Sequence, residues 1–158
     1  SAVADVIFGV VPDSGEWLVG GILDFVYRFL TGDDSPNSLE NGRNLIRSYM
    51  VNTFNPNTPN VSGVYYQSWA TKIYTITADM VLEGTWLLLF FYEGANDGLV
   101  SVNSAQWGNF RGTWTGSWYN AGGVSHINAV NHFFGVTPGA DVEAWYVDMV
   151  KDLKSRGY

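Results

Sequence analysis

The clearest hydrophobic pattern lies near the end of the chain. Apolar residues recur there every three or four positions, a spacing that places them on one face of a helix: Val142, Trp145, Tyr146, Met149, Val150 and Leu153. Asp141 precedes this stretch, and Lys154 and Arg156 stand at its end, where the helix macrodipole favours charges of these signs. The pattern predicts a helix that begins after Asp141 and ends before Gly157.

A second apolar pattern follows the break at residues 12–15 and predicts a helix from Glu16 to Thr31. Gly20 and Gly21 weaken its first turns by about 1 kcal/mol each. A wide apolar face on a marginally stable helix leaves two interpretations open. The helix can be mobile and move away from the surface against which it packs, or it can be an ordinary core helix. The apolar residues are Trp17, Leu18, Ile22, Phe25, Val26 and Phe29.

Helical and strand-like segments alternate between these two helices. Asn37 and Glu40 resemble a capping box, which predicts a helix from Ser38 to about Thr53 that ends at the polar loop 55–60. Segments 64–70 and 112–119 are rich in aromatic and β-branched residues, as is typical of strands. Segment 80–92, with Asp79 as its predicted cap, fits either structure, and its length and the cap favour a helix. Strands separated by helices predict an α/β sheet.

The composition of the chain limits the classes of binding partner that we expect. The chain has 158 residues, enough for one ordinary domain, with a net charge of -7, 15% charged residues and no cysteine. Lys and Arg form no cluster that could neutralise phosphates, so we expect no nucleic-acid partner. No apolar run reaches the roughly 20 residues of a transmembrane helix. A surface rich in Asn, Ser, Thr and Gly favours a secreted protein. Because Ser1 opens the chain without Met or a signal-peptide pattern, we expect a break within a longer protein.

Asp97 and His126 are the candidate acid and base. Neutral imidazole takes a proton near pH 7, and a carboxylate at its other nitrogen fixes the tautomer. Each residue also has a plainer interpretation, since Asn-Asp-Gly often marks only a turn and a lone histidine is often structural. For His132, which lies in an apolar stretch, we expect a hydrogen-bonded, partly buried role.

An acid followed by a histidine is the order of the second half of an α/β-hydrolase triad, whose serine lies upstream in a Gly-x-Ser-x-Gly turn. This chain has no such turn. The nearest pattern, residues 112–116, has Trp114 at its centre, and tryptophan cannot attack a carbonyl.

The chain resembles the bacterial true lipases of the Pseudomonas–Burkholderia–Proteus type, which are triacylglycerol lipases. The resemblance is collinear, and its main segments are Asn96–Val100, Ser104–Gly108 and Ser125–Val136. It implies that residues 1–158 are the C-terminal part of a single α/β-hydrolase domain, with a mostly parallel sheet flanked by helices. It also implies that 96–136 is the catalytic acid and histidine region, that Asp97 and His126 are catalytic, and that 11–31 is a lid helix. The family's serine and oxyanion amides precede Ser1, so the expected partner is an N-terminal fragment that carries them.

The resemblance also bears on metal binding. That family holds a structural calcium ion, and the corresponding side-chain positions here are Asp79, Asn128 and His132. Relative to the family, Asn128 removes a carboxylate and His132 adds an imidazole, whereas calcium prefers hard oxygen ligands. We therefore assign no cofactor and no metal ligands, and leave a structural calcium ion as the open alternative.

Together these features predict a secreted carboxylic ester hydrolase, a triacylglycerol lipase that acts at a lipid interface as a nicked heterodimer. Its Ser-His-Asp triad would combine Asp97 and His126 with the serine of the other fragment. The alternative is a non-catalytic, aromatic-rich module that binds carbohydrate or protein through Trp107, Trp114, Trp118 and Tyr119. The Asp97/His126 pair distinguishes the two, because only a hydrolase needs it.

Overall fold

The computed structural model describes residues 47–75, 78–131 and 139–158, together with the single residues Asp24, Arg28, Gly32, Asn37, Gly42 and Asn44. The chain divides into two compact units, Ser1–Asn60 and Val61–Tyr158, which are described separately. The six apolar residues of the predicted lid helix and His132 lie outside the described residues. Of the predicted helix 16–31, only Asp24 and Arg28 are described, and both are helical.

The first unit contains a helical stretch near its end. It consists of α4 (Arg47–Tyr49), a π-helix η1 (Met50–Phe54) and α5 (Asn55–Asn57). The prediction that the polar loop 55–60 ends this helix near Thr53 was wrong, because the helical path continues through Asn57. Pro56 lies in the first turn of α5.

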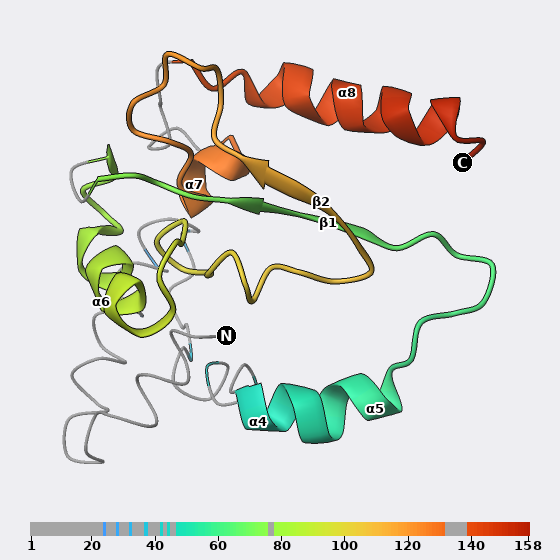
Figure 1. Cartoon of the computed structure of the whole chain (residues 1–158). Coiled ribbons are helices and arrows are strands. Elements are labelled where there is room, and N and C mark those ends of the chain that lie inside the picture. Colours follow the sequence, from blue (N-terminus) through green and yellow to red (C-terminus); the bar gives the residue numbers. More distant parts are fainter. Residues whose placement is uncertain are drawn as a thin grey trace. The chain divides into compact units, whose positions relative to one another are not determined.

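Two parallel strands form the sheet of the second unit (Figure 1). Strand β1 (Gln67–Thr71) confirms the predicted strand 64–70, but it starts and ends later. Strand β2 (Asn109–Trp114) lies earlier than the predicted 112–119, because the chain turns at Gly116, whose φ is 81°. The register of the pair shifts between Ser68 and Ala70. The described residues thus form a small α/β arrangement.

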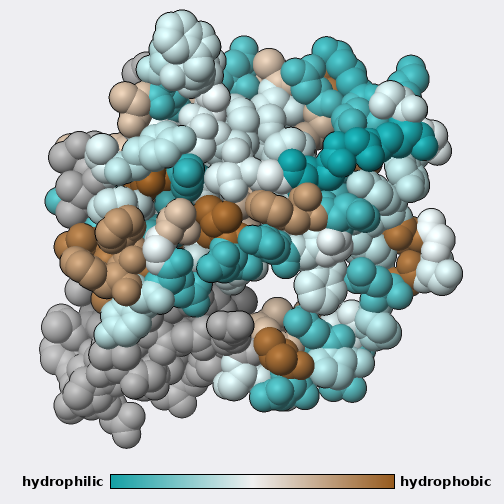
Figure 2. All heavy atoms as spheres, viewed as in Figure 1, coloured by the Kyte–Doolittle hydropathy of each residue, from teal (hydrophilic) through white to brown (hydrophobic). Residues whose placement is uncertain are grey.

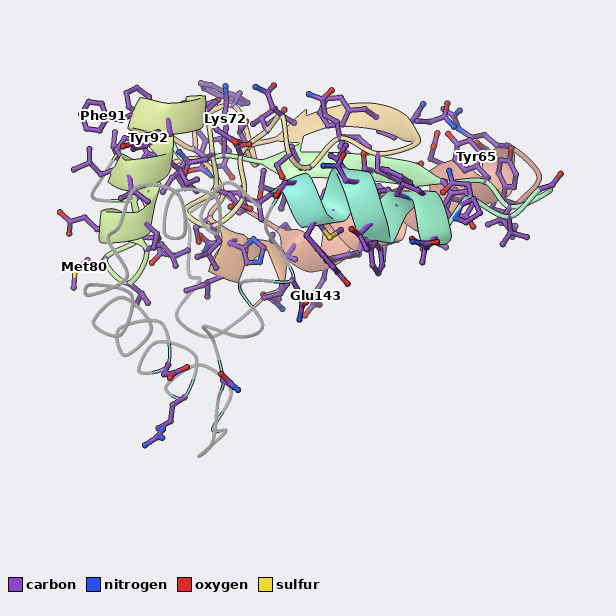
Figure 3. The ribbon with its side chains drawn as sticks, turned by 90° about the horizontal axis from the view of Figure 1, so that it is seen from below. Tyr65, Lys72, Met80, Phe91, Tyr92 and Glu143 are labelled. Atoms are coloured by element: carbon purple, nitrogen blue, oxygen red, sulfur yellow. The ribbon has the colours of Figure 1, made fainter. Side chains whose placement is uncertain are left out.

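Helix α6 (Glu83–Glu93) confirms the helical interpretation of its segment. Trp86 and Leu89 are buried, whereas the exposed side chains include Leu87, Phe90, Phe91 and Tyr92. Figure 2 shows apolar side chains gathered over α6, and Figure 3 shows Phe91 and Tyr92 pointing outward from it. Asp79 does not cap α6 itself, since Leu82 occupies the N-cap position. Instead, Oδ1 of Asp79 accepts hydrogen bonds from the amides of Val81 and Leu82, at 3.1 and 3.3 Å.

Helix α8 (Val142–Ser155) forms as its periodicity predicts. The Asp141 side chain caps it by accepting a 2.9 Å hydrogen bond from the amide of Ala144. Trp145 packs between the strands and the helix, with its ring stacked on Trp114 at 4.2 Å and edge-on to Trp69 at 6.0 Å. This aromatic contact holds α8 alongside the strand pair (Figure 1). Among the described residues, no helix has both the length and the hydrophobicity needed to cross a membrane.

Candidate active site

Two loops meet just beyond the carboxyl end of β1. The amide of Ile73 donates to the carbonyl of Asn96 at 3.0 Å, which places the turn that carries Asp97 beside the strand end. On the other side, the amide of Val124 donates to the carbonyl of Lys72 at 2.8 Å. These bonds bring the segment before α7 (His126–Ala129) to the same place. The parallel sheet therefore positions both halves of the candidate site at its carboxyl edge.

The Asp97 carboxylate is fixed by its own turn. Its Oδ1 accepts hydrogen bonds from the amides of Leu99 and Val100, at 3.0 and 2.8 Å. The turn passes through Gly98, whose φ of 102° disfavours other residues, and a Cβ there would lie 2.7 Å from Cβ of Leu82. Oδ1 is therefore occupied, and Oδ2 is left for a partner outside the turn.

That partner is His126. Its Nδ1 lies 2.9 Å from Oδ2 of Asp97, across a separation of 29 residues, so the predicted contact is confirmed. The backbone adds a second link, because the amide of His126 donates to the carbonyl of Asp97 at 2.9 Å. The Asp97 side chain is 7% exposed and that of His126 is 42% exposed. The imidazole thus has one nitrogen bound to a buried carboxylate, while part of the ring remains open to a reactant.

The carboxylate also changes the acidity of the imidazole. The hydrogen bond that Nδ1 of His126 donates to Asp97 raises the pKa of His126 above the ordinary 6.5, burial acts in the opposite direction, and the charge of Asp97 adds to the increase. Protonated His126 therefore stabilises the folded chain. This stabilisation is complete below the ordinary histidine pKa and is lost as the pH rises through the folded pKa.

Thr71 is a third member of the site that the sequence analysis missed. As the last residue of β1, it donates from Oγ1 to Oδ2 of Asp97 at 3.1 Å, and it is buried. Two donors thus share one carboxylate oxygen. The signal in the sequence was its place directly after the predicted strand 64–70, since polar groups at the carboxyl ends of parallel strands point towards the functional edge.

We expect Thr71→Val to raise the pKa of His126 further. Without the hydroxyl, the imidazole is the one donor to Oδ2 of Asp97 that remains among the described residues, and the carboxylate holds the protonated ring more strongly. NMR titration of the His126 ring protons measures the change. The matched control is Thr85→Val, which removes a hydroxyl that donates to the carbonyl of Leu82 in α6. A lower midpoint in Thr71→Val, or an equal change in both variants, would contradict the shared-oxygen interpretation.

A second buried polar cluster adjoins His126. Oγ of Ser125 lies 2.6 Å from Oδ2 of Asp79 and 2.6 Å from Oδ1 of Asn128. Asp79 and Asn128 are the two described positions at which the resemblance implies calcium ligands. They do not fit a calcium ion, because both oxygens of the single carboxylate already accept hydrogen bonds. Over the described ranges, no group of three or more His, Asp or Glu side chains could hold a metal ion.

Gly123 fixes the approach of the His126 loop. Its φ is 79°, and a Cβ on it would lie 2.3 Å from the carbonyl oxygen of Lys72. We expect Gly123→Ala to lower the free energy of unfolding by about 2 kcal/mol or more, through strain and displacement of β1. Urea denaturation measures this. The matched control is Gly84→Ala in α6, where a Cβ meets open space, and where we expect a gain of about 0.5 kcal/mol or more. Equal effects at both glycines would contradict the argument.

The aromatic residues of the alternative platform have different neighbours among the described residues. The ring of Trp114 is stacked on Trp145. Trp107 precedes β2, whereas Trp118 follows it and is 96% exposed, in edge contact with Tyr119. Trp118 and Tyr119 thus adjoin each other, as that interpretation requires.

No protein-family profile, curated protein or solved structure matches this chain. What this site can do chemically is therefore inferred from the geometry of its residues.

Proposed function

We propose that this chain is the acid and base part of a secreted carboxylic ester hydrolase, most specifically a triacylglycerol lipase. The observation that carries the proposal is the 2.9 Å contact between Oδ2 of Asp97 and Nδ1 of His126. A buried carboxylate bound to a half-exposed imidazole is the arrangement that activates a serine hydroxyl. The resemblance to the true lipases adds the substrate class, and the serine belongs to an N-terminal fragment of the same enzyme.

In this reaction Nε2 of His126 accepts the proton of the serine hydroxyl as its oxygen attacks the ester carbonyl. Asp97 remains ionised and holds the proton on Nδ1, so that Nε2 is the basic nitrogen. The protonated imidazole then gives its proton to the leaving alcohol, and an acyl-enzyme remains. Water then attacks the acyl carbonyl while Nε2 of His126 accepts its proton, and the imidazolium returns that proton to the serine oxygen as the carboxylic acid leaves.

Two features of the second unit support a partner fragment. Within the described residues the parallel sheet has only two strands. Parallel sheets normally have more strands than this, and helices cover both of their faces. The exposed side of α6 presents apolar residues, among them Phe90 and Phe91. Figure 2 shows apolar side chains gathered over this helix. An N-terminal fragment could add strands to the sheet and pack against α6, and it would then extend the strand pair and cover the apolar side of the helix.

Labelling with a fluorophosphonate probe tests this proposal. In the protein purified from its source, we expect a label on a second polypeptide that contains Gly-x-Ser-x-Gly, and none on the chain described here. Intact mass and N-terminal sequencing identify that polypeptide. Co-purification with no labelled serine, in a preparation that shows no ester hydrolysis, would overturn the proposal.

The lid part of the proposal concerns Phe25 and Phe29, which lie outside the described residues. We expect Phe25→Ser with Phe29→Ser to lower activity on ester emulsions by about 10-fold or more, because each buried phenylalanine contributes about 1.5–3 kcal/mol of contact with lipid. Activity on soluble short esters should change little. The control is Arg28→Ser, on the predicted polar face of the same helix. An equal loss on both substrates would indicate a core helix.

A further inference from the structure

We propose that Asp79, Ser125 and Asn128 form a positioning cluster that fixes His126 against Asp97 by hydrogen bonds alone, at the place where the resemblance implies a calcium ion. The kinetic part of this inference rests on the proposed function, whereas its structural part does not.

The need for such a cluster comes from the size of α7. This helix has four residues, and a single turn is not stable by itself. His126 is its first residue, so the direction of the imidazole depends on how the turn is capped. Ser125 is that cap, and it is fully buried.

The cap is closed by reciprocal bonds. Oγ of Ser125 accepts from the amide of Asn128 at 3.2 Å, and the amide of Ser125 donates to Oδ1 of Asn128 at 3.1 Å. Both side chains are almost inaccessible to water, with Asn128 only 2% exposed. Loss of either partner would therefore leave a buried polar group unpaired, which is costly. These bonds define the start of α7, and with it the backbone at His126.

Asp79 connects this cap to the other half of the site. Its Oδ2 lies 2.6 Å from Oγ of Ser125 across a separation of 46 residues, and a hydrogen bond to a carboxylate is stronger than a neutral one. Leu82, at the end of the turn that Asp79 caps, packs directly against Gly98 beside Asp97. One turn, residues 79–82, thus contacts both the loop of the base and the turn of the acid.

The hydrogen bonds occupy the oxygens that a cation would use. Oδ1 of Asp79 is taken by two backbone amides, and Oδ2 of Asp79 and Oδ1 of Asn128 both face the Ser125 hydroxyl. A calcium ion needs about six to eight oxygen ligands, and Asp79 supplies the cluster's one carboxylate. In this chain a serine hydroxyl occupies the centre of the cluster.

The test is an NMR measurement on the full chain, in the presence of a chelator and with His132→Gln as background so that one histidine remains. We expect a low-field Nδ1 proton and a single tautomer for His126. Ser125→Ala and Asp79→Asn should each lose that signal and give mixed tautomers, and the double variant should resemble either single one. Ser125→Thr, which retains the hydroxyl, should retain the signal.

A control separates positioning from stability. Asp141→Ala removes the capping carboxylate of α8 and should leave the His126 signals unchanged, although it weakens a helix cap. If Ser125→Ala fails to fold, Asp79→Asn, which keeps the shape of the side chain, decides the matter. Unchanged His126 signals in a folded Asp79→Asn variant, or signals that require added calcium in the parent chain, would overturn the proposal.

Rate measurements on the assembled hydrolase test the kinetic part of the proposal. We expect Asp79→Asn to lower kcat by roughly 10- to 100-fold with little change in KM, because a small displacement of the base affects the transition state more than binding. A preparation in which the NMR signals are lost as expected, but in which no variant or parent hydrolyses esters, would count against the proposed function and not against the cluster.

Discussion

Replacing His126 by alanine should lower kcat of the assembled hydrolase by about 10⁴- to 10⁶-fold while KM stays nearly constant. The imidazole is the group that removes the proton of the serine, and its Nδ1 is already bound to Asp97. Alanine leaves Asp97 without a base to act through. Initial rates on a soluble ester, measured over a range of concentrations, separate kcat from KM.

The matched control is the other histidine of the chain. His132→Gln should keep most activity, because its predicted role is a hydrogen-bonded structural one. An inactive His132→Gln variant would mean that the wrong histidine was chosen, and near-normal turnover in His126→Ala would refute the assignment of the base.

Asp97→Asn should lower kcat by about 10⁴-fold. The asparagine carbonyl keeps the hydrogen bonds from the amides of Leu99 and Val100, so its NH₂ group replaces Oδ2 and faces His126. An NH₂ group donates to Nδ1, which forces the proton of the neutral ring onto Nε2. The nitrogen that must accept the serine proton is then already protonated. Rate measurements together with the His126 tautomer by NMR check both parts of the argument.

Stability separates this effect from misfolding. Because the turn around residue 97 keeps its backbone hydrogen bonds, we expect the free energy of unfolding of Asp97→Asn to stay within about 1–2 kcal/mol of the parent. Asp141→Asn is the control with the same chemical change, at the cap of α8, where asparagine is an equally good cap. It should alter neither rate nor tautomer. A fully active Asp97→Asn variant would remove the acid from the mechanism.

The elements that the sequence predicted well are those that depend on local pattern. The last helix combined strong periodicity with a capping residue, Asp141, and the structure has both. The segment that became α6 was ambiguous in periodicity, and its length and the predicted Asp79 cap favoured the helix that forms, although Leu82 is its actual N-cap. Boundaries were less accurate, because they depend on tertiary contacts. Strand β2 begins at Asn109 only because β1 lies beside it and supplies its pairing partners.

The sequence predicted the acid and the base of the site but not the residues that hydrogen-bond around them. Asp97 and His126 were identified by the chemistry of their side chains and by order along the chain, and their contact is present. Thr71 and Ser125 were missed as contributors because a threonine at a strand end and a serine before a helix are common. Their importance comes from which buried oxygen they face, and this depends on chain segments that lie far apart in sequence.

The parallel pairing of β1 with β2 also affects the order of folding. Parallel strands cannot be joined by a tight turn, and the Asp97–His126 contact closes 29 residues while the Asp79–Ser125 contact closes 46. Contacts between residues far apart in sequence form slowly, because closing the loop between them costs chain entropy before the contact stabilises it. Helix α8 needs only contacts between neighbours in sequence and can form within microseconds. After dilution from denaturant, helical circular dichroism should therefore return before the His126 environment does, and refolding chains will pass through a helical but chemically inert stage.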